Sequence, residues 1–314
     1  MKFGTEQQAV SGVPARATQE AEAGRPDWRW VEASIWTERM VSALVNGVKG
    51  GKWYSLMDKL IRPATLEAAW QKVARNKGAA GVDGQSIERF AVQAERYLQE
   101  LQAGLKEGSY QPCPVKRVEI PKGDGRTRPL GVPTVKDRIV QTALKMVIEP
   151  IFEVQFRPGS YGFRPGRSCK DALREVDRLL KAGFTWVVDA DLKSYFDTIP
   201  HDKLMTLVAS AISDGMVLSL VESFLQQDIM KGMARWAPTT GTPQGAVVSP
   251  LLANTGCQRP CSPWRMASRE KLLAGAEILP IMRRIPFRGA PNIPDRTAAA
   301  FYWWVTSCRG CATG

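Results

Sequence analysis

The sequence predicts a mixed α/β (α+β) fold, because stretches with helical spacing and stretches with strand spacing follow one another along the chain. Residues 27–47, 65–78 and 78–104 carry apolar side chains at helical spacing, and each stretch ends at a glycine. Residues 110–134 form two short runs around the turn sequence KGDG, which is typical of a β-hairpin. Residues 184–192 alternate as a strand with one buried face does.

Several helix starts are marked by side chains that can cap free backbone N–H groups. A Ser or Thr followed three residues later by an acid forms a capping box, and proline is favoured in a first helical turn. The expected starts are Thr65, the pair Thr134 and Asp137, the pair Ser168 and Asp171, and Pro200.

The strand at residues 184–192 separates its side chains onto two faces. One face carries only apolar residues (Trp186, Val188, Ala190 and Leu192), and the other carries Val187, Asp189 and Asp191. Carboxylates are hard oxygen ligands, and Mg²⁺ needs only one or two of them beside a substrate phosphate. An aspartate here also commonly caps a turn between a strand and a helix. The spacing alone leaves both interpretations open.

Basic side chains gather near the tip of the predicted hairpin. Lys122, Arg126 and Arg128 flank the turn, where ammonium and guanidinium groups can hold a triphosphate. A solvated tip has the same composition. The hairpin is therefore a candidate phosphate-binding element with a structural alternative.

The stretch TPQGAVVSP begins at residue 242 with residues suited to close approach of a ligand. Gly245 has no side chain to keep a ligand away. Gln244 offers both a donor and an acceptor. The same stretch also suits the start of a helix.

The formal net charge of +12 favours a polyanionic partner such as nucleic acid. No apolar run is long enough for a membrane span, and residues 1–27 lack the centre of a signal peptide, so we expect a cytoplasmic protein without membrane association. Cysteines in that compartment are expected to be free thiols. Zinc is the less favoured interpretation of the spacing of Cys257, Cys261, Cys308 and Cys311.

Four motifs occur in the order in which reverse transcriptases carry them: IPKGDGRTRPLGVPTVKDRIVQ, SYGFRPGRSCKDAL, VVDADLKSYFDTIPH and GTPQGAVVSPLLAN. With NGVKGGKWYSLMDKL and ARNKGAAGVDGQSIERF, they make residues 28–254 closely resemble the proteins encoded by bacterial group II introns. Such proteins copy RNA into DNA and, as maturases, bind their intron RNA. The resemblance implies a right-hand polymerase fold with group II intron RNA, a DNA primer or target, and dNTP as partners.

The resemblance also implies a division of the chain. A polar leader (1–27) precedes a helical N-terminal extension (28–110), the fingers (111–185) and a partial palm (186–254). Residues 255–314 show none of the motifs that carry the resemblance and are expected to be an unrelated, irregular tail. The remaining palm and the thumb are then missing.

Roles for single residues follow from the same resemblance. Asp191 matches the first catalytic aspartate and would ligate Mg²⁺ together with the Leu192 carbonyl, while Asp189 has no carried-over role. Phe196 matches the bulky residue that rejects a ribose 2′-hydroxyl. The residues that match those holding the incoming triphosphate or packing on the nascent base pair are Lys122, Arg128, Gln244 and Gly245. The implied reaction is attack of a primer 3′-hydroxyl on the dNTP, assisted by two Mg²⁺ ions.

The family's aromatic-x-Asp-Asp motif is missing, since the sequence contains no adjacent pair of aspartates. Two metal ions about 3.5–4 Å apart need carboxylates from two strands, which Asp191 alone does not provide. We therefore expect a truncated reverse transcriptase that is inactive by itself. An unpaired sheet edge beside Asp191 would also favour aggregation. A non-catalytic RNA-binding fragment is the alternative function.

Overall fold

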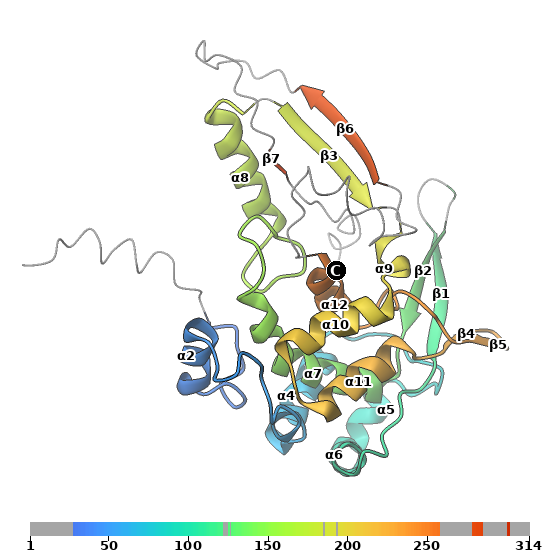
Figure 1. The fold of residues 1–314 in the computed structure, drawn as a ribbon. Helices are drawn as coiled ribbons and strands as arrows, with labels where there is room; N and C mark the ends of the chain where they lie inside the picture. The colour runs from blue at the N-terminus through green and yellow to red at the C-terminus, as the bar shows by residue number, and fades with distance from the viewer. Residues whose placement is uncertain are drawn as a thin grey trace, which may run out of the picture.

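The structure is a computed structural model in which a helical body carries two separate β-sheets (Figure 1). It describes residues 28–121, 125, 127–184, 186–192, 194–257, 278–284 and 300–301. For 186–192, 278–284 and 300–301 it describes the backbone only. Within the described part of the chain, no helix combines the length and apolar character needed to cross a membrane.

The described chain opens with helices α2 (Glu38–Asn46), α3 (Met57–Leu60), α4 (Pro63–Arg75), α5 (Ile87–Val92) and α6 (Ala94–Glu107). Helix α2 begins at its cap Thr37, later than the apolar spacing suggests, and ends at Gly47, as predicted. Helix α4 begins before its predicted N-cap Thr65, because Pro63 occupies its first turn. Thr65 lies inside the helix instead, and its hydroxyl donates to the Lys59 carbonyl at 2.7 Å.

The predicted hairpin is confirmed. Strands β1 (Val115–Pro121) and β2 (Thr127–Val132) pair antiparallel, with Lys116 opposite Val132 at one end of the ladder. A later hairpin, β4 (Ile229–Lys231) and β5 (Ala234–Trp236), extends this sheet because β4 pairs parallel to β1. The resulting order is β2-β1-β4-β5.

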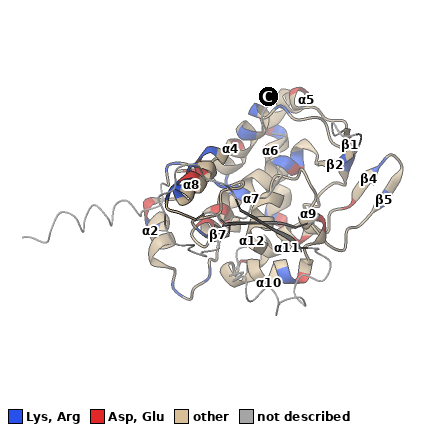
Figure 2. Cartoon of the chain, turned by 90° about the horizontal axis from the view of Figure 1, so that it is seen from above, with Lys and Arg blue, Asp and Glu red and all other residues tan. Residues whose placement is uncertain are grey.

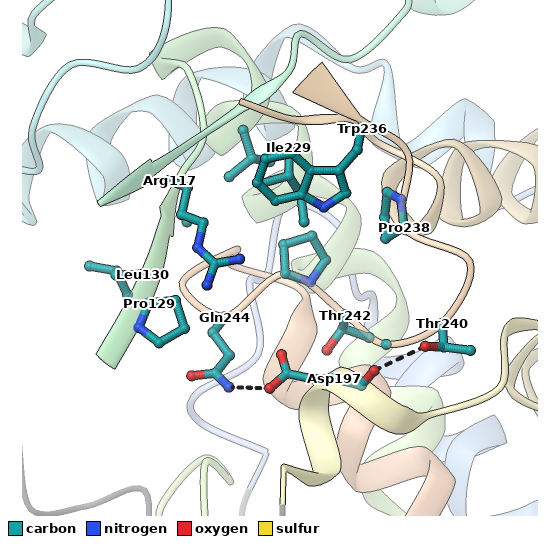
Figure 3. Close-up of a pocket in the computed structure, with 14 residues that line it drawn as sticks. Arg117, Pro129, Leu130, Asp197, Ile229, Trp236, Pro238, Thr240, Thr242 and Gln244 are labelled. Atoms are coloured by element: carbon teal, nitrogen blue, oxygen red, sulfur yellow. Dashed lines mark hydrogen bonds between the residues drawn. The ribbon is translucent and has the colours of Figure 1, made fainter. Parts of the chain in front are cut away.

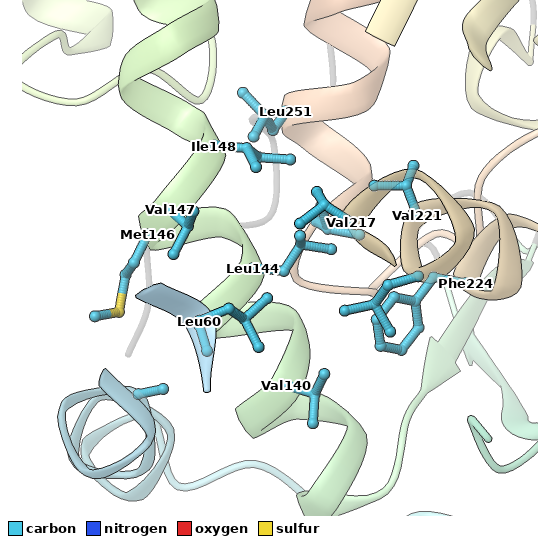
Figure 4. Packing of buried hydrophobic residues seen from close by; sticks show 14 of the residues in the cluster. Leu60, Val140, Leu144, Met146, Val147, Ile148, Val217, Val221, Phe224 and Leu251 are labelled. Carbon is cyan, nitrogen blue, oxygen red and sulfur yellow. The ribbon is translucent and has the colours of Figure 1, made fainter. Parts of the chain in front are cut away.

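Helix α7 (Val135–Glu153) is the centre of the core and is buried along most of its length. It packs against α4, α3, α6 and α12 (Ser249–Cys257). In Figure 4, Leu144 and Ile148 of α7 face Val217 and Val221 of α11 (Gly215–Leu225). These side chains belong to one hydrophobic cluster that also includes Leu60 and Leu251. Residues far apart in the sequence therefore share one core.

The two predicted capping boxes differ in outcome. Helix α8 (Cys169–Lys181) has the complete box, since Ser168 and Asp171 each accept from the other's backbone N–H. At α7, Thr134 accepts from the Asp137 N–H at 3.1 Å, but the Asp137 carboxylate accepts from the Tyr110 hydroxyl at 2.6 Å and the Cys113 N–H at 3.2 Å instead. Asp137 is 1% exposed, and its carboxylate therefore accepts hydrogen bonds inside the core and does not cap the start of α7.

One carboxylate caps two helices. Asp214 accepts from Met216 and Val217 at the start of α11, with N–O distances of 3.1 and 3.2 Å. Its other oxygen accepts from the N–H groups of Leu56 and Met57, at 2.7 and 2.9 Å, where α3 begins. Asp214 thereby ties the N-terminal helices to the region after α10 (His201–Ala211).

The loop before α8 is fastened by a buried arginine. Arg164 is 7% exposed, and its guanidinium donates to both carboxylate oxygens of Glu153 at the end of α7. It also donates to the carbonyls of Arg157 and Ser160, at 2.6 and 2.8 Å. The side chain of Asn254 donates to the Gly162 carbonyl at 2.9 Å, which connects this loop to α12.

Strand β3 (Trp186–Leu192) lies between two strands from the C-terminal tail. It pairs antiparallel with β6 (Ile278–Arg284) and parallel with β7 (Ala300–Phe301), so the order is β6-β3-β7. The prediction of an unpaired edge beside Asp191 is wrong on the side of β6, where Asp191 lies opposite Leu279, whereas the recorded pairing with β7 involves Val187 and Val188. Expecting a wholly irregular tail is also wrong for these two stretches, because backbone pairing needs no alternating pattern in the partner strand. Cys261, Cys308 and Cys311, the rest of the zinc spacing, lie outside the described residues.

Candidate nucleotide and nucleic-acid site

Asp191 and Leu192 occupy the last two positions of β3. In the ladder with β6, Asp191 is opposite Leu279 and Leu192 is opposite Ile278, while Asp189 is opposite Ile281. The predicted strand and its register positions are therefore present. The side chains of this strand lie outside the described part, so their metal-binding role stays a prediction.

The residues beside Asp191 do not fit a pair of magnesium ions. Neither β6, with the sequence ILPIMRR, nor the two residues of β7 contain a carboxylate. No group of three or more His, Cys, Asp or Glu that could hold a metal occurs among the described side chains. Asp191 is thus paired with β6, and neither strand beside β3 adds the second acidic ligand that such a site requires.

Phe196 lies on the short helix α9 (Tyr195–Thr198), which follows β3. Its ring is partly buried against the hydrophobic core and meets the ring of Tyr195 edge-on, with centroids 6.3 Å apart. The Tyr195 hydroxyl donates to the Ala253 carbonyl of α12 at 3.1 Å. Its position directly after β3 and its packing are suited to the predicted steric role, which remains a prediction.

The segment 242–245, called the PQG loop below, joins α9 to the β1–β2 hairpin. The Thr242 N–H donates to the Phe196 carbonyl, and the Gly131 N–H on β2 donates to the Gln244 carbonyl, both at 2.6 Å. The Gln244 side-chain amide donates to the Asp197 carboxylate at 3.2 Å (Figure 3). The structure thus brings Phe196, Gln244 and the hairpin together, while their predicted roles stay predictions.

Gly245 is required by the close approach of the PQG loop to β2. Its φ is +104°, and a Cβ there would lie 2.3 Å from the Gly131 carbonyl oxygen. Any side chain would push the loop off the hairpin and strain the backbone. The tight turn therefore uses Gly245 against protein backbone, which is a structural reason for the glycine beside the predicted ligand role.

The predicted phosphate-binding residues are only partly described. Arg128 lies on β2 opposite Ile120. Lys122 and Arg126 lie outside the described residues. The structure therefore places one of the two predicted triphosphate contacts, Arg128, on the hairpin that touches the PQG loop.

His201, the only histidine of the chain, fixes the approach to the PQG loop. As the first residue of α10, it contacts the Gly241 carbonyl through Nε2 at 2.7 Å. The Gly241 N–H donates to the Ile199 carbonyl at 2.8 Å, and Pro200 pairs with Thr240 in an isolated bridge. These contacts hold residues 240–242 against the start of α10.

A pocket of about 280 Å³ lies between the hairpins, α9 and the PQG loop (Figure 3). Sequence reasoning missed five of its polar or aromatic lining residues: Arg117, Asp197, Trp236, Thr240 and Thr242. Partial burial raises the pKa of the Asp197 carboxyl, although the Gln244 hydrogen bond and the Arg117 charge act in the opposite direction. For Asp197, the sequence signal is an acid directly after two aromatic residues.

The surface charges are largely mixed. Figure 2 shows Lys and Arg on helices such as α4, α6 and α8, with acidic residues on α8 as well. On α8, Arg174, Arg178 and Lys181 each pair with an acid of the same helix. The described surface therefore gives no simple reason to place all nucleic-acid contacts on one helix.

Comparison with known families agrees with this arrangement. Residues 120–274 match the family described as reverse transcriptase (RNA-dependent DNA polymerase). This part of the chain is similar to reverse transcriptases, and the helices and sheets of the structure fit a mixed α/β polymerase fold.

The chain is also similar to individual proteins, one of them named as encoded by a group II intron. It is 43% identical over 206 residues to Protein YkfC of Escherichia coli, covering 63% of this chain and 54% of that protein. It is 37% identical over 198 residues to the group II intron-encoded protein LtrA of Lactococcus lactis, covering 62% of this chain and 32% of that protein. The chain thus spans about half or less of these relatives.

A solved structure is more loosely similar. A chain of the partial Cas6-RT-Cas1–Cas2 complex is 26% identical, with 64% of this chain and 33% of that chain covered and a TM-score of 0.43.

Proposed function

We propose that residues 28–257 form the RNA- and nucleotide-gripping part of a group II intron-type reverse transcriptase/maturase. The observation that carries this proposal is the PQG loop, which is hydrogen-bonded to both α9 and β2. These are the segments whose motifs, in this order, resemble the family. Group II intron RNA, a DNA primer or target, and dNTP are the proposed partners.

The residues of this arrangement have separate proposed roles. Arg128, with Lys122, holds the triphosphate of an incoming dNTP, since a guanidinium binds phosphate through forked hydrogen bonds. Phe196 excludes a ribose 2′-hydroxyl by its bulk. Gln244 and Gly245 support the nascent base pair from the PQG loop. Asp191 is the proposed acidic ligand, together with the Leu192 carbonyl, for the divalent ions that reverse transcriptases generally use.

We also propose that this 314-residue chain does not polymerise DNA by itself. The strands on both sides of β3 carry no acid, so the second carboxylate of a two-ion site is not supplied there. An Asp-Asp pair occurs nowhere in the sequence. Substrate binding and catalysis are therefore expected to separate in this chain.

Primer extension tests this separation. The purified chain is incubated with a primed RNA template, dNTPs and Mg²⁺, with an active reverse transcriptase as a positive control. We expect no template-dependent DNA product. A full-length product that disappears in the Asp191→Asn variant would show that the chain does build a working site.

A non-catalytic RNA-binding role is the second candidate, and the net charge of +12 favours it. Filter binding of a structured group II intron RNA, compared with an unstructured RNA of equal length, measures it directly. We expect the intron RNA to be retained, with an affinity that falls steeply as salt rises. Loss of both RNA binding and polymerisation would contradict both functions.

A further inference from the structure

The pocket beside the PQG loop has the size and walls of a site for one planar ring system. Its volume is about 280 Å³, and its lining comes from both hairpins, α9 and the PQG loop. Apolar walls are provided by Pro129, Ile229, Trp236 and Pro238 (Figure 3). Most ligand sites combine such walls with a few converging polar groups. This pocket therefore has the general form of a binding site.

The polar side chains of Arg117, Asp197 and Gln244 line the pocket and come from three different elements. Arg117 of β1 lies over the Trp236 ring, with its guanidinium carbon 5.8 Å from the ring centroid. It also pairs with Glu119, which leaves further N–H groups on its planar fork. The Asp197 carboxylate faces the same space and accepts one hydrogen bond, from Gln244. Donors and acceptors are thus present side by side.

Thr242 supplies an independent sign of a missing partner. Its side chain is 3% exposed and lines the pocket. Its hydroxyl has no hydrogen-bond partner among the described residues. A buried hydroxyl without a hydrogen-bond partner destabilises the folded protein. A ligand that forms a hydrogen bond with this hydroxyl would remove that desolvation penalty.

We propose that this pocket binds the base of an unpaired guanine in single-stranded RNA. Guanine offers N–H donors on its pairing edge, which suit the Asp197 carboxylate. Its O6 and N7 atoms are acceptors that suit the Arg117 fork. Stacking on Trp236 or Arg117 would hold the ring, as is common for splayed bases of RNA. The Thr242 hydroxyl would accept or donate one further hydrogen bond.

Adenine does not match the same set of groups. Its amino group is a donor at the position where guanine has the O6 acceptor, and its N1 is an acceptor where guanine has a donor. The Arg117 donors would then face the adenine amino donor, and the Asp197 carboxylate would face the N1 acceptor. The pocket is therefore expected to select guanine over adenine. This inference rests on the proposed function, in which RNA is held against the PQG loop.

Fluorescence anisotropy with the full chain tests the inference. The probes are labelled RNA pentamers of uridine with guanosine, inosine or adenosine at the centre. Since a good bidentate contact discriminates strongly between bases, we expect the guanosine pentamer to bind about tenfold more tightly than the adenosine pentamer. Inosine lacks the 2-amino group and should fall between them.

Three variants and one control locate the effect. Asp197→Asn and Arg117→Ala should abolish the preference for guanosine, and Thr242→Val should reduce it. Asp177→Asn is the control because Asp177 lies on α8, far in sequence from the pocket residues, and pairs with Lys181 of the same helix. Circular dichroism checks that each variant folds, and Thr242→Val remains as the conservative test if a charge change disturbs the fold.

The anisotropy results can contradict the guanine pocket without contradicting the proposed RNA binding. RNA binding without a guanosine preference, or a preference unchanged in Asp197→Asn and Arg117→Ala, would overturn the pocket while leaving RNA binding intact. Titration with GMP distinguishes the source of the base. Binding of GMP in competition with the guanosine pentamer supports the pocket, whereas GMP binding without any pentamer binding would contradict RNA as its source.

Discussion

Strands β1 and β3 both contain charged residues in their sequences, but their backbones have very different surroundings. The first residue of β1, Val115, is fully buried, and its N–H donates to the Asp228 carbonyl at 2.7 Å. The β1 sheet lies beside the helical body, whereas Figure 1 shows β3 and β6 at the same end of the molecule as α8, away from α4 and α6. For β3 the structure records backbone pairing with two strands from the tail.

This difference indicates that the sequence specifies the structure around β1 more strongly than the structure around β3. Around β1, pairing, core packing and the PQG loop all require the same arrangement, and such agreement is typical of a well-defined fold. Around β3, the partner strands supply hydrogen bonds but no carboxylate. A predicted catalytic position can therefore lie in a regular sheet without the neighbours that its chemistry needs.

The largest expected effect is a core truncation that weakens the body on which β1 depends. Leu144 on α7 is fully buried, so Leu144→Ala should lower the free energy of unfolding by about 2–5 kcal/mol. Chemical denaturation measures this change. Leu173→Ala is the matched control, because Leu173 is 59% exposed and its loss should cost less than about 0.5 kcal/mol. Equal costs would contradict the assignment of α7 as the core.

The double cap at Asp214 gives the next largest expected effect. Asp214→Ala removes the acceptor for the starts of both α3 and α11, and each lost cap costs about 1 kcal/mol. We therefore expect a loss of about 2 kcal/mol in unfolding free energy, beyond that of a single cap. Asp177→Ala provides the control on exposed α8. A loss no greater than in that control would show that the two helix starts are not coupled.

Asp137 tests how strongly burial governs the junction between α6, β1 and α7. Asn in its place accepts fewer of the present hydrogen bonds, so Asp137→Asn should cost about 1–3 kcal/mol. Burial raises the pKa of Asp137 despite its hydrogen bonds from Tyr110 and Thr134. The folded protein therefore holds the proton more tightly than the unfolded chain does.

The pH dependence follows from this direction. Between the ordinary pKa of aspartate and the raised one, the Asp137 contribution to stability is present at the lower pH and is lost as pH rises. The stability gap between the wild-type protein and Asp137→Asn should narrow over that window in urea denaturation. A gap that widens with pH would indicate that the pKa is lowered.

Removal of residues 258–314 should change the unfolding free energy of the body least. The contacts recorded for β6 and β7 are with β3, so the core around α7 should keep its denaturation midpoint. The bare edges of β3 should instead reduce solubility. Light scattering and urea denaturation measure the two effects separately. A large loss of core stability would remove the contrast between β1 and β3.

Short-range features of the fold could be predicted from the sequence. The β1–β2 hairpin and the Ser168–Asp171 capping box depend on residues within one turn or one helix start. Pro63 shows the limit even there, because it moved the start of α4 away from Thr65. Local signals compete, and the stronger backbone preference of proline decides.

Long-range partners could not be predicted in this way. Asp137 meets Tyr110, and Asp214 meets Leu56, only because α7 and α11 pack into one core. The same holds for the pocket, where Arg117, Asp197 and Thr242 come from three segments without a shared pattern. The resemblance located Phe196, Gln244 and Gly245, whereas the polar groups behind them became visible only in three dimensions.

The buried Arg164 changes how the positive charge of this chain should be counted. Affinity for a polyphosphate grows with the number of condensed ions that protein cations displace, which the slope of a salt titration reports. The guanidinium of Arg164 donates to Glu153 and to loop carbonyls, so it does not displace ions condensed on the polyphosphate. The slope should therefore be shallower than the number of arginines in SYGFRPGR suggests, and that charge stiffens a loop instead.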